Sequence, residues 1–199
     1  MIGVSAYEGE SGLALARRYE AVSAPDLHGP VADLIPSAPS LVLDVGAGSG
    51  RDAAWLAKKG HEVLAVEPSS TFRLEGERMH PDPRISWIKD RLPGLDEVRG
   101  LGATYEVILL SAVWQHISSK DRPRAFRTLN GLLAPGGLLL ISLRLGPPDL
   151  ARDMHPVCVT ELRDLAAVTG LDVLREAPLP DRMGRSEISW VTMAVEKRL

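Results

Sequence analysis

The chain has 199 residues, of which 45% are hydrophobic and 25% charged, and its formal net charge at pH 7 is -3. These values are typical of one globular domain with a packed core. The slightly acidic balance disfavours nucleic acid as a partner, because phosphate neutralisation favours a basic surface. Cys158 is the single cysteine, so neither a disulfide framework nor a cysteine-rich metal site is expected.

The sequence offers no run of apolar residues long enough to cross a membrane. The first ten residues, MIGVSAYEGE, lack the basic and apolar regions of a signal peptide. We therefore expect a cytoplasmic protein with no membrane partner.

The N-terminal part has a helical pattern of apolar residues over positions 1–24, which is expected to end near Pro25. A stretch broken by prolines follows, with one short helix predicted at residues 31–35. Residues 1–39 are thus predicted to be a helical segment that precedes the first strand.

The segment LVLDVGAGSG at positions 41–50 is the most informative part of the chain. Its apolar residues predict a buried parallel strand. Gly46, Gly48 and Gly50 allow a tight turn and a close approach of the backbone to a ligand. A helix is predicted over residues 51–60. Strand, glycine loop and helix in this order form a nucleotide-type binding site, although a glycine turn in an unrelated α/β protein has the same appearance.

The spacing of the glycines limits the class of ligand that the loop can bind. In the dinucleotide fingerprint the third glycine comes one residue later, at the position that Arg51 occupies here. No Lys-Ser/Thr pair follows, so the loop is not a phosphate-binding P-loop. The carboxylate of Asp44 would repel a pyrophosphate and favour a cationic ligand.

Further apolar runs predict strands at residues 63–66, 85–88, 107–110 and 138–143, with a Pro-Gly-Gly turn at 135–137 before the last of them. A helix is predicted at residues 160–169, with Thr160 as its N-cap and Gly170 as its C-cap. Two closing strands follow at 171–175 and 188–196. This alternation predicts an α/β fold built on a doubly wound, mostly parallel sheet of seven strands.

With these motifs in order, residues 40–199 resemble the class I S-adenosylmethionine-dependent methyltransferases of the small-molecule type. The resemblance rests on Asp44 with its G-x-G-x-G loop, on Glu67 after the second strand, on Asp90 after the third, and on the Pro-Gly-Gly turn. It implies a Rossmann-like sheet with an antiparallel last strand, and S-adenosylmethionine as the cofactor. The expected organisation is a single methyltransferase domain over 1–199, with a core at 40–199 and residues 1–39 able to fold over the site as a lid.

The resemblance also implies which residues contact the cofactor. Glu67 would accept hydrogen bonds from the two ribose hydroxyls, and Asp90 would accept one from the adenine amine. Either Ile88 or Arg91 could flank the adenine ring. The full predicted set is Asp44, Gly46, Ala47, Gly48, Gly50, Glu67, Pro68, Asp90, Arg91 and Ser111.

Two histidines are the candidate catalytic bases. His116 follows the fourth strand, where it could take a proton or merely orient a loop. His155 lies in the loop after the fifth strand. Tyr7, Tyr19 and His28 belong to the N-terminal segment and are further candidates, whereas Arg182 and Arg185 could pair with an anionic substrate or simply be solvated.

Several methyltransferase subclasses are disfavoured. The sequence SAVW stands after the fourth strand in place of the N/D-P-P-Y/F tetrapeptide of amino-methylating DNA and protein enzymes, and no metal site is predicted. The expected function is methyl transfer to O or N of a small molecule. The alternatives are a non-catalytic S-adenosylmethionine-binding module or partner subunit, and a nicotinamide-dependent oxidoreductase, which the early third glycine and Asp44 oppose.

Overall fold

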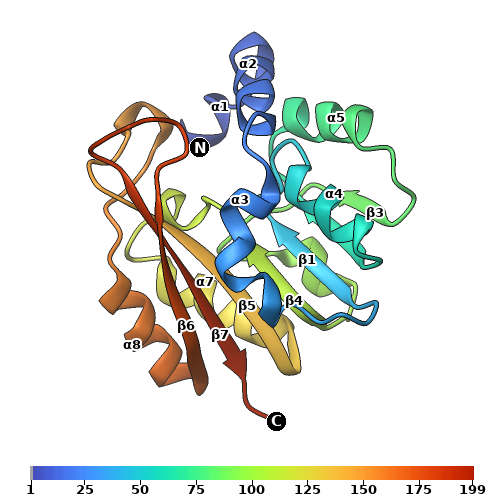
Figure 1. Cartoon of the computed structure of the whole chain (residues 1–199), viewed down its shortest axis with the longest axis vertical. Helices are drawn as coiled ribbons and strands as arrows, with labels where there is room; N and C mark the ends of the chain where they lie inside the picture. The colour runs from blue at the N-terminus through green and yellow to red at the C-terminus, as the bar shows by residue number, and fades with distance from the viewer. Residues whose placement is uncertain (1) are drawn as a thin grey trace.

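The computed structural model describes residues 2–199, which fold around a seven-stranded sheet with the order β3-β2-β1-β4-β5-β7-β6 (Figure 1). The strands are β1 Leu41–Val45, β2 Glu62–Val66, β3 Ile85–Ile88, β4 Tyr105–Leu110, β5 Leu133–Leu145, β6 Leu171–Pro180 and β7 Ser189–Lys197. The last strand, β7, runs antiparallel to both of its neighbours, and the other strands share one direction. The predicted Rossmann-like α/β fold with an antiparallel last strand is confirmed.

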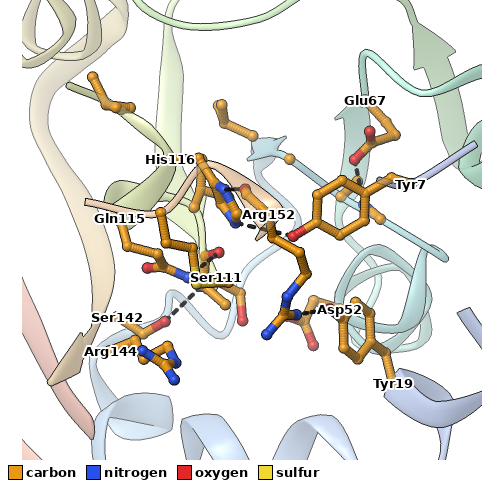
Figure 2. A pocket seen from close by; sticks show the side chains of 18 of the residues that line it. Tyr7, Tyr19, Asp52, Glu67, Ser111, Gln115, His116, Ser142, Arg144 and Arg152 are labelled. Atoms are coloured by element: carbon orange, nitrogen blue, oxygen red, sulfur yellow. Dashed lines mark hydrogen bonds between the residues drawn. The ribbon is translucent and has the colours of Figure 1, made fainter. Parts of the chain in front are cut away.

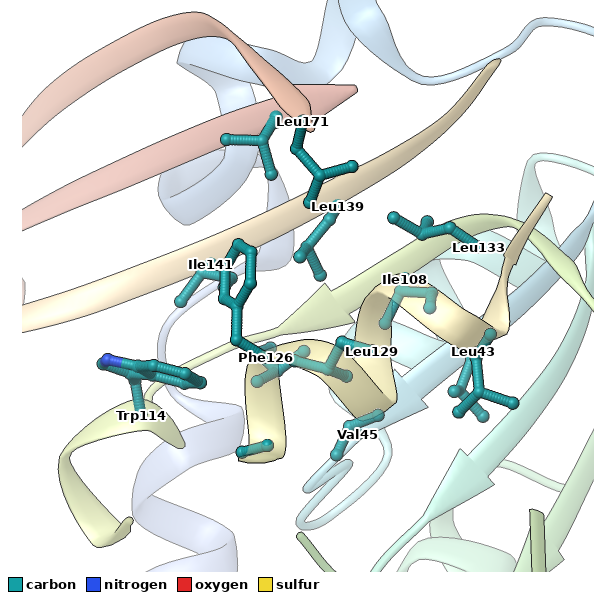
Figure 3. Close-up of a cluster of buried hydrophobic side chains, with 14 of the residues drawn as sticks. Leu43, Val45, Ile108, Trp114, Phe126, Leu129, Leu133, Leu139, Ile141 and Leu171 are labelled. Carbon is teal, nitrogen blue, oxygen red and sulfur yellow. The ribbon is translucent and has the colours of Figure 1, made fainter. Parts of the chain in front are cut away.

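Helices lie on both faces of the sheet. They are α1 Ile2–Ser5, α2 Gly9–Glu20, α3 Ala24–His28, η1 Gly29–Leu34, α4 Arg51–Lys58, α5 Ser70–Met79, α6 Asp96–Gly100, η2 Trp114–His116, α7 Arg122–Leu132, η3 Leu150–Arg152 and α8 Val159–Thr169. One apolar core lies between the sheet and helices α6, α7 and α8 (Figure 3). A second core lies between the opposite face and helices α4 and η1.

The alternation of side chains along each strand divides the apolar residues between the two cores. On β4, Ile108 and Leu110 belong to the core under α7, whereas Val107 and Leu109 belong to the core under α4. Successive side chains of a strand point to opposite faces, so an unbroken apolar run is required where both faces are covered. Burial of each such side chain contributes about 1.5–3 kcal/mol.

The helix boundaries correct two expectations. Pro25 lies in the first turn of α3 instead of ending a helix; Ser23 is the N-cap, and its hydroxyl accepts from the Asp26 N–H. A proline is tolerated there because the N–H that it lacks has no partner within the helix. Cys158, not Thr160, is the N-cap of α8, with its sulfur 3.4 Å from the N–H of Glu161. Gly170 is the C-cap, as predicted.

The Pro-Gly-Gly segment lies within β5 as an irregularity of the strand. The register moves from Tyr105 opposite Leu133 to Val107 opposite Leu138, so residues 134–137 bulge out of the ladder. β6 continues to Pro180, past the predicted end at 175. An edge strand accepts prolines because one side of its backbone needs no ladder partner.

The parallel strands end together at one edge of the sheet. Helices α1 and α2 and the loop between β6 and β7 lie at this edge (Figure 1). Among residues 2–199, no helix has the length and apolarity needed to cross a bilayer.

Candidate functional site

A cavity of about 530 Å³ opens at the edge where the parallel strands end. Its wall extends from the ends of β2 and β3 to the ends of β5 and β7. The predicted site residues that line it are Gly46, Ala47, Gly48, Glu67, Pro68, Asp90, Arg91, Ser111, His116 and His155. Asp44 and Gly50 belong to the same loop region but do not line the cavity.

The glycine loop is fixed by backbone hydrogen bonds from Gly46 and Ala47 to the carbonyl of Val66, at 2.7 and 3.0 Å. Both Gly46 and Gly48 have positive φ, +73° and +58°. A Cβ on Gly46 would lie 2.4 Å from Cγ2 of Val113, whereas one on Gly48 would meet nothing closer than a carbonyl 4.0 Å away. Gly46 is therefore needed for packing, and Gly48 leaves open space beside the backbone at the cavity wall.

Gly50 has a packing role at the start of α4. It is the N-cap of this helix with φ +88°, and a Cβ there would lie 2.9 Å from the Trp87 ring. Gly50 does not line the cavity, and its contact with the cofactor stays a prediction.

Glu67 is a buried carboxylate at the end of β2. One oxygen accepts from the N–H of Gly48 at 3.0 Å and the other from the N–H of Ser69 at 2.8 Å. Burial raises the pKa of Glu67 to about 7, although these two hydrogen bonds act in the opposite direction. The loop and the carboxylate are thus held together as one unit.

Asp44 lies beneath the loop and is only 1% exposed. It points to the same face of the sheet as Val42, toward α4, and its Oδ2 has no hydrogen-bond partner among the described residues. Burial, with the charge of Asp52 next in importance, raises the pKa of Asp44 well above its usual range. Asp44 is therefore a buried carboxyl behind the cavity wall, and its raised pKa favours the uncharged form.

Asp52 and Arg51, at the start of α4, line the cavity where Asp44 does not. Asp52 is 3.0 Å from Nε2 of His28 and 2.7 Å from Nε of Arg51. Burial opposes its ionisation, but the charges of these two partners hold the pKa of Asp52 well below its usual range. The ionised carboxylate fixes α3 of the N-terminal segment to α4 of the core.

Asp90 follows β3 at the far end of the cavity. Its Oδ1 accepts from the N–H of Arg91 at 2.8 Å, and its Oδ2 accepts from the N–H of Val98 at 3.0 Å. The second bond fixes the carboxylate to α6. Each carboxylate oxygen has two lone pairs, so capacity for a ligand donor remains.

His116 is part of a half-buried polar network in the cavity (Figure 2). Its Nδ1 is 3.1 Å from the carbonyl oxygen of Arg152, and its Nε2 is 3.1 Å from the hydroxyl of Tyr7. A carbonyl only accepts, so we assign the proton to Nδ1, and Nε2 then accepts from Tyr7. Burial lowers the pKa of His116 to about 4, which leaves the ring neutral near pH 7.

His155 lies at the rim. Its side chain is 37% exposed, with Nε2 4.0 Å from the carboxylate of Asp153. Its backbone N–H donates to the carbonyl of Gln115 at 2.7 Å, which ties this loop to η2. The structure thus brings both candidate bases to one cavity, His116 inside it and His155 at its opening.

Two arginines of the cavity wall were not predicted. Arg152 donates to the hydroxyl of Tyr19 at 3.0 Å and pairs with Asp149 at 2.8 Å. Arg144, at the end of β5, is 8% exposed and donates to the carbonyl of Pro147 at 2.6 Å. The sequence signal for Arg144 is its position inside the apolar run LLLISLRLG, where a charged residue is unusual.

The two arginines that the sequence did suggest behave differently. Arg185 pairs with Asp181 at 2.6 Å, and this same carboxylate accepts from the Trp190 indole at 3.0 Å. Arg182 is exposed at the cavity's edge. Arg185 is therefore committed to an internal pair.

Comparison with known proteins identifies the family. The sequence profile of a methyltransferase domain matches residues 17–176. The chain belongs to this methyltransferase family. Its fold matches a Burkholderia thailandensis 1,6-didemethyltoxoflavin-N1-methyltransferase, solved with bound 1,6-didemethyltoxoflavin and S-adenosylhomocysteine, at 19% identity and a TM-score of 0.66, over 96% of this chain and 92% of that one.

Other relatives agree on the family. An S-adenosylmethionine-dependent methyltransferase from Methanosarcina mazei matches with 17% identity and a TM-score of 0.70, over 87% of this chain and 99% of that one. A ubiquinone biosynthesis O-methyltransferase from Methylocella silvestris is 31% identical over 98 residues, which are 49% of this chain and 37% of that protein. The methyltransferase spans about half or less of the length of the first curated relatives that it matches.

These findings confirm the predicted family and fold class, and a solved neighbour of the same fold holds S-adenosylhomocysteine. The cavity fits S-adenosylmethionine on its own features: an open glycine at the wall, the buried Glu67 at a strand end, and Asp90 at the next strand end.

Proposed function

We propose that this methyltransferase transfers the methyl group of S-adenosylmethionine to an oxygen or nitrogen of a small molecule. The observation that supports this proposal is one continuous cavity whose two ends are lined by different sets of residues. The glycine loop, Glu67 and Asp90 lie at one end, and a second polar set around Ser142 and Arg144 lies at the other. A volume of about 530 Å³ is in the range of small-molecule sites.

In this proposal the first end holds the cofactor. Glu67 accepts the two ribose hydroxyls, Asp90 accepts the adenine amine, and the open side of Gly48 lets the backbone approach the ligand. The cofactor, when bound, supplies a methyl group on a sulfonium for in-line displacement. The task of the protein is then to place the acceptor atom about 3 Å from that methyl carbon.

The pair of Tyr7 and His116 is proposed to remove the acceptor's proton. The acceptor gives its proton to the Tyr7 oxygen while the Tyr7 proton moves to Nε2 of His116. The neutral ring and the 3.1 Å contact support this route. A positioned base contributes about 10²–10⁴ in rate. An amine acceptor that is already neutral needs the pair less.

Residues 1–39 are proposed to act as a lid over the core at 40–199. Tyr7 and Tyr19 of this segment line the cavity, and Tyr7 is one of the proposed proton carriers. Closing the segment would therefore both exclude water and complete the site.

The test is a turnover screen. The purified protein is incubated with S-adenosylmethionine and a library of small hydroxyl and amine compounds, and S-adenosylhomocysteine is measured by mass spectrometry. We expect it to form in equal amount with a methylated product. Cofactor binding without turnover on any acceptor would instead favour the non-catalytic module.

A further inference from the structure

The face of the sheet that carries Arg144 changes from apolar to polar toward the cavity. On β5, Leu138 and Leu140 pack in the core under α4, and Ser142 and Arg144 continue the same face. The opposite face of the strand stays apolar to Leu143. Polar side chains in a buried strand are costly unless they have partners, so their restriction to the cavity side points to a ligand.

The neighbouring strand β7 shows the same change from apolar to polar side chains. In the antiparallel register, Thr192 lies opposite Ser142 and Trp190 lies opposite Arg144. All four side chains line the cavity, beyond the core residue Ala194 on the same face of β7. Two strands that are distant in sequence therefore build one polar wall.

The cavity at this wall holds polar atoms that the protein itself does not satisfy. Nε of Arg144, Oγ1 of Thr192 and Oε1 of Gln115 are buried and have no hydrogen-bond partner within residues 2–199. Arg144 is 8% and Thr192 is 1% exposed. Most buried polar groups in folded proteins are paired, so three unpaired atoms around one cavity indicate a site built for a polar ligand.

The charges around Arg144 leave it without a counter-ion. The acids whose charges act on Arg144 are Asp149 and Asp181, which pair with Arg152 and Arg185 respectively. No carboxylate of the described chain lies within 4.0 Å of Arg144. Burial, followed by the charges of Arg185 and Arg152, lowers the pKa of the Arg144 guanidinium, which still remains protonated. This end of the cavity thus carries an excess of positive charge.

The position of Arg144 separates it from the proposed cofactor end. Figure 2 shows Arg144 and Ser142 on one side of the pocket and Glu67 on the opposite side, with His116, Tyr7 and Arg152 between them. A group bound to Arg144 would therefore belong to the acceptor, with the proposed proton carriers next to its reacting part.

We propose that the methyl acceptor is a small organic acid, and that Arg144 binds its carboxylate at the end of the cavity opposite Glu67. The planar guanidinium matches a carboxylate with two parallel hydrogen bonds, and Thr192 can donate a third. The Trp190 ring and the apolar side chains near it then contact the body of the acid. This inference rests on the proposed function, since it names the substrate class of that reaction.

The test compares matched acids and amides. Calorimetric titrations use 4-hydroxybenzoate with 4-hydroxybenzamide, 4-aminobenzoate with 4-aminobenzamide, and phenyl phosphate as a different anion, with and without saturating S-adenosylhomocysteine. We expect each acid to bind about tenfold or more tightly than its amide. The acid preference should disappear in Arg144→Met and survive in part in Arg144→Lys. Arg124→Met, which removes an exposed arginine of α7, should leave the preference unchanged.

Three results would overturn the proposal: equal binding of acids and amides, no binding of any acid at millimolar concentration, or an undiminished preference in Arg144→Met. Tighter binding of phenyl phosphate than of either acid would overturn the assignment of a carboxylate. A loss of affinity of Arg144→Met for S-adenosylhomocysteine, but not for methylthioadenosine, would assign Arg144 to the cofactor's own carboxylate. Failure of S-adenosylhomocysteine to bind the unmodified protein would refute the proposed function instead, and the acid–amide comparison is then made on the protein alone.

Discussion

Gly46 and Gly48 lie two positions apart in the same loop, but their surroundings predict different consequences of substitution. Gly46→Ala forces a Cβ against Val113 and should lower the stability of the whole protein, whereas Gly48→Ala places a methyl group in open space. The positive φ alone costs about 1–2 kcal/mol at either position. We expect Gly48→Ala to lose mainly cofactor affinity. Denaturant titration and calorimetry on both variants separate the two effects, and equal stability of both would contradict this assignment.

The proposed role of Glu67 in binding the ribose predicts that cofactor binding depends on pH. Its pKa of about 7 means that the carboxyl is mostly protonated at pH 6 and ionised at pH 8. Only the ionised form accepts both ribose hydroxyls, so the Kd for S-adenosylhomocysteine should rise about tenfold from pH 8 to pH 6. Glu67→Gln should bind more weakly and show a flat profile over this range. The same slope in Glu67→Gln would show that another group titrates.

The same pKa acts in the opposite direction on the stability of the free protein. Unfolded glutamate ionises near 4.5, but Glu67 in the folded chain ionises near 7, so the folded state holds more protons between these values. The contribution of Glu67 to the free energy of unfolding therefore falls as pH rises from about 4.5 to 7. Denaturant midpoints of the wild type and Glu67→Gln should diverge across this window, and parallel curves would contradict the assigned pKa.

The Tyr7–His116 pair predicts a loss of turnover without a loss of cofactor binding. His116→Ala and Tyr7→Phe should each lower kcat about a hundredfold or more for a hydroxyl acceptor. Because the pKa of His116 is about 4, kcat should not vary between pH 6 and 8 through this residue. His155→Ala is the matched comparison: if it alone loses turnover, the base is His155.

At the residue level, most of the cavity wall could be predicted because parallel strands end at one edge, so residues following β1, β2 and β3 must meet. Asp44 lies behind the wall because the two-residue period of β1 points it toward α4, and its role in cofactor binding stays a prediction. Arg144 was missed because its surroundings depend on the pairing of β5 with β7, which brings Trp190 beside it. No local pattern in the sequence contains that register.

At the level of elements, Glu8 joins the N-terminal segment to α5. Its carboxylate accepts from the N–H groups of Ser70 and Thr71 and from both hydroxyls, at 2.7–3.2 Å. These bonds satisfy free N–H groups of the first turn of α5 and complement its dipole. Despite the opposing effect of burial, they lower the pKa of Glu8 to about 2.

Glu8→Ala should therefore loosen the segment over the cavity and lower the free energy of unfolding by about 1 kcal/mol. Hydrogen exchange over residues 2–20 should accelerate, whereas Glu10→Ala, an exposed acid of α2, should leave it unchanged. Since the folded pKa of Glu8 lies below the unfolded value of 4.5, this contribution is complete above about pH 5 and is lost as pH falls toward 2. Unchanged exchange in Glu8→Ala would contradict the contact.

The elements themselves differ in how well local sequence defines them. The buried strands could be predicted because their apolar runs leave no other arrangement with both faces covered. Helix starts such as that of α8 could not be predicted from the sequence. Cys158 takes the N-cap position with its weak sulfur acceptor, whereas Thr160, the better capping residue, lies inside the helix.

At the scale of the whole molecule, the order β3-β2-β1-β4-β5-β7-β6 places the two ends of the cavity over different halves of the sheet. The proposed cofactor end lies over β1, β2 and β3, and the Arg144 end lies over β5 and β7. The glycine loop, with Glu67 and Asp90 at successive strand ends, predicts that these residues line one cavity, as they do. The second half, and the position of Tyr7 and Tyr19 in the cavity wall, depend on contacts between segments distant in sequence.

The central claim is that this cavity binds S-adenosylmethionine through Glu67 and the glycine loop. The most direct measurement is calorimetric titration of the wild type and of Glu67→Gln with S-adenosylmethionine, S-adenosylhomocysteine and NAD⁺ side by side. We predict one site for the first two ligands, weakened in the variant, and no heat with NAD⁺. Binding of NAD⁺ alone, or no binding of S-adenosylmethionine by the wild type, would contradict the account.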